Sequence, residues 1–178
     1  FWIWLQLKTI ADIGIIGLPN AGKSSLLASL TSATPKIANY KFTTLNPNLG
    51  VAIYDDKEIT LADIPGLIEG AHKGTGLGIK FLKHIERCKI LLHLIDISEK
   101  NLVNSYSQVR EEMAKYSSEL LKKQEIIVFN KTDLVDEEEK NKKIKEFHEI
   151  IKKPTFETST LDKKSVSDIK SKLLNYVS

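Results

Sequence analysis

Cysteine is nearly absent from this sequence, since Cys88 is the only one among 178 residues. A single thiol cannot form an intramolecular disulfide, so we expect a reducing compartment and take the cytoplasm as the location. Long apolar stretches are also lacking, because Gly, Asp, His or Lys interrupts the longest runs before the roughly 18 residues that a membrane-spanning helix requires. We therefore expect no membrane span.

A strong charge of one sign is lacking as well. The 26 Lys and Arg residues exceed the 23 Asp and Glu residues by a formal net charge of +3, which is too little to imply a nucleic-acid partner by itself. The acidic run at 136–139 is followed by lysines. Because Glu138–Lys142 and Glu139–Lys143 are i,i+4 pairs in the favourable order, they predict a solvated helix face rather than an interaction tail.

The length of the chain allows one sizeable hydrophobic core and leaves little room for a second. Residues 1–8 are densely apolar and aromatic, but they lack the basic segment and cleavage site of a secretory signal. We interpret 1–8 as a linker or strand from a preceding domain, with an arm of the same domain as the alternative. Residues 9–178 are predicted to form a single domain.

Helical and strand patterns alternate along this domain. We expect strands over 11–17, 89–97, 126–130 and 155–159, and helices over 22–32, 77–87, 101–122, 137–152 and 165–177. Residues 49–54 and 59–63 flank a polar turn and predict an antiparallel hairpin. This order predicts an α/β fold with a doubly wound, mainly parallel sheet flanked by helices, whose ligands bind at the carboxyl ends of the strands.

A complete G-x-x-x-x-G-K-[ST] phosphate-binding loop lies between the first strand and the first helix. Its residues are Gly17, Leu18, Pro19, Asn20, Ala21, Gly22, Lys23 and Ser24, with Ser25 next in the helix. The glycines allow backbone N–H groups to face phosphates, Lys23 neutralises the β and γ phosphates, and the Ser24 hydroxyl can ligate Mg²⁺. The alternative, an ordinary flexible glycine loop, does not account for the strand and helix on either side.

The motif Asn130-Lys131-Thr132-Asp133 follows another predicted strand and indicates which base is bound. The Asp133 carboxylate can accept from N1–H and N2–H₂ of guanine, while the stem of Lys131 packs across the ring. Adenine lacks this pair of donors. The motif therefore predicts guanine, with a simple surface turn as the alternative.

Two further motifs suggest a second metal anchor and a switch. Asp63-Ile64-Pro65-Gly66 lies at the end of a predicted strand, where a carboxylate can hold Mg²⁺ through water and the Gly66 N–H can meet a γ-phosphate. Phe42-Thr43-Thr44 lies in an irregular stretch, where a threonine hydroxyl can complete the metal shell. Either motif alone would be interpreted as an ordinary turn.

These motifs resemble the Obg family of ribosome-associated GTPases, within the P-loop NTPases of Ras-like G-domain fold. The resemblance rests on GLPNAGKSSLL at 17–27, YKFTTLNPNLG at 40–50, the stretch 62–87, and NKTD at 130–133. It implies a GTP-binding domain over 9–178 without the family's N-terminal Obg domain. It also implies GTP and GDP as ligands, the alarmone ppGpp as a further one, the large ribosomal subunit or its rRNA as partner, and a monomer.

The resemblance also assigns residue roles. Ser24, Thr44 and Asp63 would bind Mg²⁺, and the first switch would comprise Phe42, Thr43, Thr44, Leu45 and Asn46. Asp63, Ile64, Pro65 and Gly66 would begin the second switch. The guanine contacts would be Asn130, Lys131 and Asp133, with Leu134 beside them. Ser159 and Thr160 occupy the place of the family's Ser-Ala motif, with Leu161 next to them.

For hydrolysis, the catalytic candidates are Lys23, Thr44, Gly66 and Asn20. Leu67 occupies the place where many GTPases have a water-orienting Gln, so we expect slow intrinsic turnover that a partner accelerates. Asn20 resembles the residue that binds K⁺ in potassium-stimulated GTPases, with a merely structural role as the alternative. The competing functions are a guanine-nucleotide or alarmone sensor with negligible hydrolysis and, more distantly, a small-molecule kinase.

Overall fold

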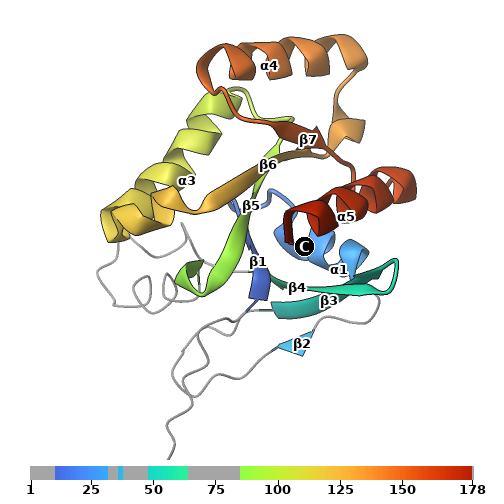
Figure 1. The fold of residues 1–178 in the computed structure, drawn as a ribbon. Helices are drawn as coiled ribbons and strands as arrows, with labels where there is room; N and C mark the ends of the chain where they lie inside the picture. The colour runs from blue at the N-terminus through green and yellow to red at the C-terminus, as the bar shows by residue number, and fades with distance from the viewer. Residues whose placement is uncertain (1–10, 32–35, 38–47, 64–84, 178) are drawn as a thin grey trace, which may run out of the picture.

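The computed structural model describes residues 11–31, 36–37, 48–63 and 85–177 of the chain, and these build one seven-stranded sheet between helices (Figure 1). The strands are β1 (Ala11–Ile16), β2 (Lys36–Ile37), β3 (Asn48–Tyr54), β4 (Lys57–Asp63), β5 (Cys88–Asp96), β6 (Gln124–Asn130) and β7 (Thr155–Glu157). The helices are α1 (Lys23–Leu30), α3 (Leu102–Tyr116), α4 (Glu137–Ile150) and α5 (Lys163–Val177), with the 3₁₀ turns η2 (Ser118–Lys122) and η3 (Thr132–Leu134).

The strand order is β2-β3-β4-β1-β5-β6-β7, and the five strands from β4 to β7 in that order run parallel. Strand β3 is antiparallel to β4 and to β2. The predicted doubly wound, mainly parallel α/β sheet is confirmed. Because parallel strands end at the same edge, the segments that follow β1, β4, β5, β6 and β7 are brought together there.

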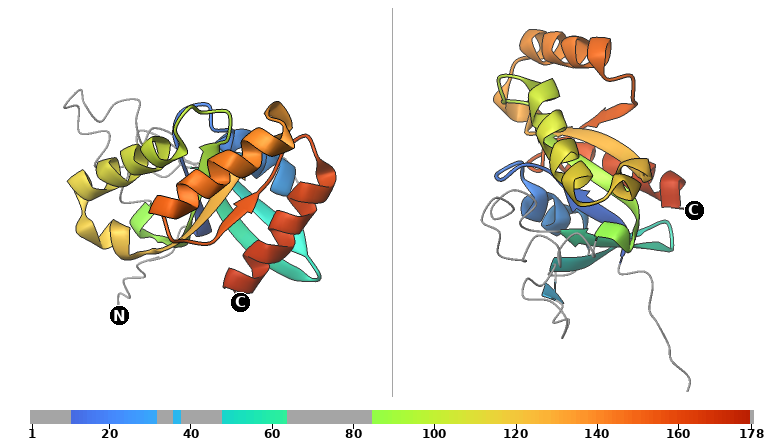
Figure 2. Two further views of the ribbon diagram at one scale, coloured as in Figure 1. Left: turned by 90° about the horizontal axis from the view of Figure 1, so that it is seen from above. Right: turned by 90° about the vertical axis from the view of Figure 1, so that its left-hand side faces the viewer.

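The helices cover both faces of the sheet (Figure 2). Helices α1 and α5 pack on one face, where Leu26 and Leu27 meet Ile169 and Leu173 over the apolar residues of β1 and β5. Helices α3 and α4 cover the opposite face, where Phe147 of α4 packs edge-on against Phe129 of β6. The central strands are apolar on both sides because both of their faces are buried.

The hairpin predicted over 49–54 and 59–63 is confirmed and extends by a residue or two at its ends. Tyr54 pairs with Lys57 across a two-residue turn in which Asp55 and Asp56 both have positive φ, 49° and 58°. Two positive φ values give the turn that matches the right-handed twist of a hairpin, and aspartate tolerates this conformation better than most residues.

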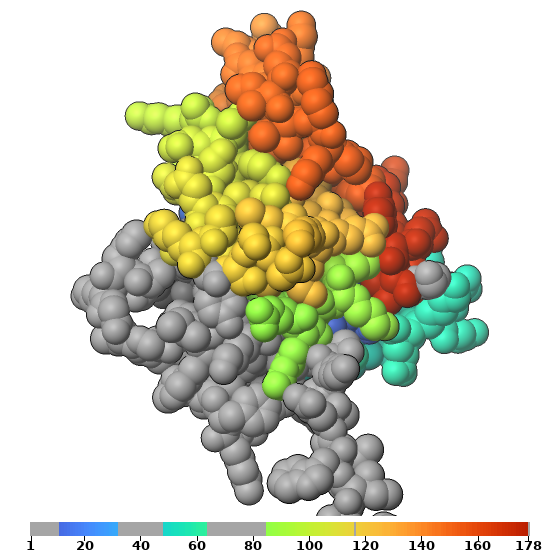
Figure 3. Space-filling view, turned by 60° about the vertical axis from the view of Figure 1, so that its left-hand side comes forward, coloured from blue at the N-terminus to red at the C-terminus, as the bar shows by residue number. Residues whose placement is uncertain are grey.

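The single long helix predicted over 101–122 is wrong. Helix α3 ends at Tyr116, Ser117 is extended at φ −159°, and η2 follows. The Ser117 hydroxyl accepts a hydrogen bond from the Glu119 N–H at 3.2 Å, so a local side-chain bond competes with the helical pattern. Most of the helix predicted over 77–87 lies outside the described residues. The space-filling view in Figure 3 looks onto the face where α3 contacts both η2 and α4.

A buried charged cluster lies at the amino end of β6. The Glu125 side chain is 1% exposed, and its carboxylate oxygens lie 2.9 Å from His93 Nδ1, 3.1 Å from Tyr106 OH, 3.2 Å from Arg110 and 2.6 Å from Lys153 Nζ. Burial alone would raise the pKa of Glu125, but the contacts with His93 and Lys153 outweigh it and lower the pKa to about 2. The cluster therefore links β5, α3 and the segment between α4 and β7 to one ionised carboxylate.

Among the helices of the described residues, none is long and apolar enough to cross a membrane.

Candidate functional site

The phosphate-binding loop turns sharply between β1 and α1, and its two glycines are required there. Gly17 has φ 153°, and a Cβ added to it would lie 2.4 Å from the Leu94 carbonyl oxygen. Gly22 has φ 94°, and its Cβ would lie 2.4 Å from Asn130 Nδ2. Asn20 also adopts a left-handed conformation, at φ 64°. Larger residues at the glycine positions would displace either the neighbouring strand or the loop itself.

Lys23 curves back over this loop. Its Nζ donates to the carbonyl oxygens of Gly17 at 3.1 Å and of Leu18 at 3.0 Å. These bonds hold the ammonium group over the loop, ahead of the first turn of α1. A cation there complements the N–H groups at the start of the helix, so the loop is suited to an anion such as a phosphate chain.

Ser24 and Asp63 come together although 39 positions separate them in the sequence. Ser24 Oγ donates to Asp63 Oδ2 at 2.5 Å, and the other oxygen, Oδ1, is buried without a hydrogen-bond partner in the described part of the chain. A hydroxyl and a buried carboxylate with an unused oxygen are ligands that Mg²⁺ prefers. The described residues contain no group of three or more His, Cys, Asp or Glu side chains placed so that they could hold a metal ion, so further ligands here would include water or phosphate oxygens.

Asn130 connects the motif at the end of β6 to the phosphate loop. Its side chain is fully buried, and Nδ2 donates to the Ala21 carbonyl oxygen at 2.9 Å. The same Nδ2 is the atom that a Cβ on Gly22 would meet. The two motifs, 109 positions apart, are thus in direct contact, and a ligand that spans both would have its phosphates and its base fixed relative to each other.

Asp133 and the loop after β7 form the next contact. Ser159 Oγ donates to Asp133 Oδ1 at 2.5 Å, and Ser165 Oγ accepts from the Ser159 N–H at 3.0 Å. The Thr160 amide has no acceptor among the described residues. By contrast, all of its neighbours donate a backbone hydrogen bond, namely Thr158, Ser159, Leu161 and Asp162. Beside Asp133, the Thr160 amide is available for a ligand oxygen. Ser165 was not among the residues that the sequence singled out.

Lys131 is held by a residue that the sequence analysis missed. Lys131 has φ 62°, and its Nζ lies 2.6 Å from Oδ2 of Asp96, the last residue of β5. Burial raises the pKa of the Asp96 carboxyl, but hydrogen bonds from Lys131 and Ser98 more than offset this and hold the pKa below its ordinary value. The only sequence signal for Asp96 was its position at the end of a predicted strand.

Other predicted site residues fall outside the described residues or carry no contact that tests them. Phe42, Thr43, Thr44, Leu45, Asn46, Ile64, Pro65 and Gly66 lie outside the described residues. Leu134 and Leu161 are exposed, at 59% and 82%, beside the Asp133 and Ser159 contact. Their roles remain predictions.

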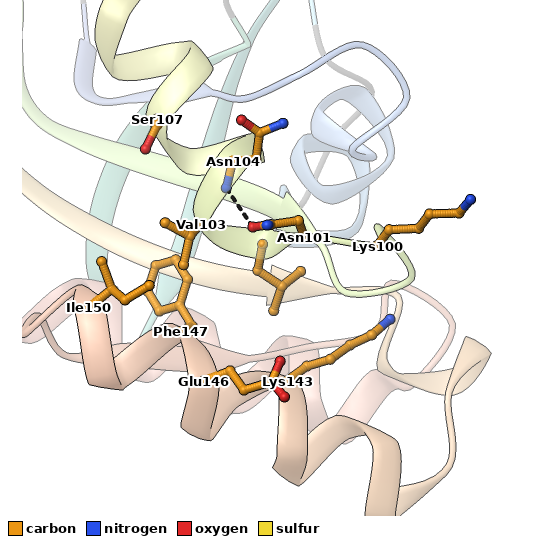
Figure 4. Close-up of a pocket in the computed structure, with 10 residues that line it drawn as sticks. Lys100, Asn101, Val103, Asn104, Ser107, Lys143, Glu146, Phe147 and Ile150 are labelled. Carbon is orange, nitrogen blue, oxygen red and sulfur yellow. Dashed lines mark hydrogen bonds between the residues drawn. The ribbon is translucent and has the colours of Figure 1, made fainter.

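A cavity of about 350 Å³ lies away from these motifs, between the start of α3 and helix α4 (Figure 4). Phe147 and Ile150 form apolar lining, Lys143 and Glu146 lie along α4, and Asn101 caps α3 by accepting from the Asn104 N–H. This cavity shares no residue with the phosphate loop, so cavity size alone would point away from the converging motifs.

Comparisons with known proteins agree with this geometry. The family described as 50S ribosome-binding GTPase matches residues 12–131. The chain is 70% identical over 176 residues to GTPase Obg of Pelagibacter ubique, covering 99% of this chain and 54% of that protein. It is 54% identical over 168 residues to GTPase Obg of Rickettsia prowazekii, covering 94% and 51%. The chain thus spans about half the length of these curated relatives.

Among solved structures, Era of Aquifex aeolicus bound to GDP·AlF4⁻ matches with a TM-score of 0.72 at 24% identity, covering 93% of this chain and 56% of that one. At this identity the match concerns the fold, and the two chains share the same α/β architecture.

Proposed function

The chain belongs to the 50S ribosome-binding GTPase family, and from this premise we propose that it is a Mg²⁺-dependent guanine-nucleotide switch that hydrolyses GTP to GDP and phosphate. The Obg relatives confirm the family resemblance indicated by the motifs. The observation that carries the proposal is the buried bond from Asn130 Nδ2 to the Ala21 carbonyl, because it joins the base motif to the phosphate loop in one site.

In this site the protein groups divide between base and phosphates. Asp133 would accept from the guanine N1–H and N2–H₂, and the free Thr160 amide would donate to the guanine O6. Lys131 would cover the ring with its stem. At the other end, the loop amides and Lys23 would bind the phosphate oxygens. To reach them, the Lys23 ammonium would exchange its hydrogen bonds to the carbonyl oxygens of Gly17 and Leu18 for bonds to phosphate.

The Mg²⁺ ligands from the protein would be Ser24 and Asp63, with Thr44 completing the set as the family resemblance implies. When bound, Mg²⁺ supplies positive charge that stabilises the charge developing on the transferred phosphoryl group. The chain itself contributes the orientation of the nucleotide and a second cation, Lys23. Gly66 would donate its N–H to the γ-phosphate. This contact would be lost when GTP hydrolysis removes that phosphate, so the segment would respond to the state of the nucleotide.

Hydrolysis is favoured over the sensor alternative because the family and its Obg relatives are named as GTPases. Turnover by the chain alone should be slow, since Leu67 cannot orient water. We propose that K⁺ bound near Asn20 supplies part of the missing positive charge. The left-handed Asn20 is consistent with this proposal, and equally with a role in the turn alone. Turnover rates in matched KCl and NaCl separate the two, and equal rates would exclude the K⁺ role.

The proposed partner is the large ribosomal subunit or its rRNA, in line with the family description, with a role in subunit assembly and growth control. We also propose ppGpp as a competing ligand, a monomeric state and a cytoplasmic location.

The experiment is multiple-turnover phosphate release from GTP with and without purified large ribosomal subunits, with small subunits as the matched control. A rate increase specific to large subunits is expected. A rate that stays negligible in every condition, together with tight GDP binding, would favour the sensor instead.

A further inference from the structure

We infer that Asp96 is a positioning residue for the base: it holds Lys131 in place before the nucleotide arrives and so slows the departure of guanine nucleotides. The inference rests on the proposed function, in that Lys131 must contact the base. It concerns a residue that belongs to none of the four sequence motifs.

Both carboxylate oxygens of Asp96 are engaged, and they face different elements. Oδ2 lies 2.6 Å from Lys131 Nζ, whereas Oδ1 accepts from the N–H of Ser98 at 2.9 Å and from its hydroxyl at 2.7 Å. The two bonds from Ser98 fix the carboxylate in one orientation. Only 12% of the Asp96 side chain and 28% of the Lys131 side chain are exposed, so solvent screens this pair less than a surface pair.

The backbone reinforces this placement. Asp96 lies opposite Asn130 in the parallel pairing of β5 and β6, and the Ile97 N–H donates to the Asn130 carbonyl oxygen at 3.0 Å. Asp96 also lines a small cavity together with Leu18 and Pro19 of the phosphate loop. Asp96 therefore lies where the phosphate loop, the end of β5 and the base motif meet.

The physical reason for a functional effect is the flexibility of lysine. A lysine side chain loses considerable rotamer freedom when it is fixed against a ring, and a bound state must offset that loss. An ammonium already anchored by a rigid carboxylate has lost this freedom in the free protein, which favours binding by preorganisation. Because the base takes no part in phosphoryl transfer, the effect should appear in nucleotide affinity and not in kcat.

The test measures dissociation of the fluorescent nucleotide methylanthraniloyl-GDP by stopped flow, together with kcat and KM for GTP. Asp96→Asn keeps an oxygen acceptor but removes the charge, and it should accelerate dissociation by about tenfold. The GTP KM should rise with kcat unchanged. The preference for guanine over hypoxanthine bases should also be retained, because Asp133 reads the 2-amino group.

Asp12 provides a matched control at the amino end of β1. It lies 2.7 Å from Lys89 Nζ and accepts from the N–H and hydroxyl of Thr60 at 3.0 and 2.8 Å. Asp12→Asn thus removes an equivalent carboxylate far along the strand from the site. Its nucleotide dissociation should match wild type.

A double-variant cycle shows whether Asp96 acts through Lys131. In a Lys131→Met background, which keeps the apolar stem, Asp96→Asn should change dissociation by less than about twofold. An undiminished effect in that background would mean that Asp96 acts through the Ser98 turn, and would overturn the inference. So would wild-type dissociation in Asp96→Asn alone. If wild type binds no guanine nucleotide, or Asp133→Asn binds as wild type does, the proposed function itself fails.

Discussion

Replacing Glu125 with glutamine should separate the stability of this domain from its nucleotide binding. Glu125 lies at the amino end of β6, whereas the phosphate loop lies at the carboxyl ends of the parallel strands, and the Glu125 side chain is buried. Glutamine has nearly the same shape but no charge. The substitution leaves His93 and Tyr106 facing a neutral amide, while Arg110 and Lys153 are exposed enough to hydrate instead.

The magnitude follows from the pKa. The Glu125 pKa of about 2 in the folded protein lies below its ordinary value of 4.5, which corresponds to about 3 kcal/mol of stability at pH 7. Because the folded pKa is depressed, this contribution is complete above the unfolded value and is lost as the pH falls from about 4.5 toward 2. At pH 3 it should have shrunk to about 1 kcal/mol.

Urea unfolding followed by circular dichroism at pH 7 and at lower pH measures this difference directly. The free energy of unfolding of Glu125→Gln should be lower than that of wild type by about 3 kcal/mol at pH 7, and the difference should shrink in acid. Its GDP affinity should be unchanged. Glu119→Gln is the control, because Glu119 and Lys122 form an ion pair with 70% of each side chain exposed, which solvent screens. A pH-independent loss in Glu125→Gln would show that packing, not charge, explains the cluster.

Three further outcomes follow from the site and core. Gly22→Ala should weaken GDP binding by at least about tenfold, because φ 94° is strained for alanine and its Cβ displaces Asn130; calorimetry showing wild-type affinity would contradict this. Chelation of Mg²⁺ should weaken nucleotide binding in wild type and much less in Ser24→Ala or Asp63→Asn; equal sensitivity would argue against these ligands. Cys88, buried with its pKa raised to about 12, should resist a thiol reagent at pH 8 until the protein is unfolded, and rapid labelling of the native protein would refute its burial.

The sequence predicted the meeting of the motifs because each follows a strand of a parallel sheet. Once the alternation of helices and strands is recognised, 17–24 and 130–133 must emerge at the same edge, and the structure adds their direct contact through Asn130. The same reasoning reached Ser24 and Asp63, because β1, which leads into the phosphate loop, pairs with β4, which ends at Asp63. Topology thus explains the success without any side-chain geometry.

Side-chain pairings across elements could not be predicted in this way. Asp96 looked like the end of an apolar strand, and nothing in its spacing from Lys131 indicates that the two meet. Glu125 likewise looked like an ordinary polar residue before a strand. Its partners come from three other segments, so no local sequence pattern indicates them. The break of the helix at Ser117 depends on one local hydrogen bond, which helical periodicity does not register.

The central claim, a site for guanine nucleotides, is tested most directly by calorimetric titration. GDP, a non-hydrolysable GTP analogue and its ATP counterpart are titrated with Mg²⁺ into wild type and Asp133→Asn. The account predicts binding of both guanine nucleotides, little binding of the adenine one, and loss of the guanine preference in Asp133→Asn. Equal affinity for the ATP analogue, or an unaffected variant, would contradict the assignment of the base site.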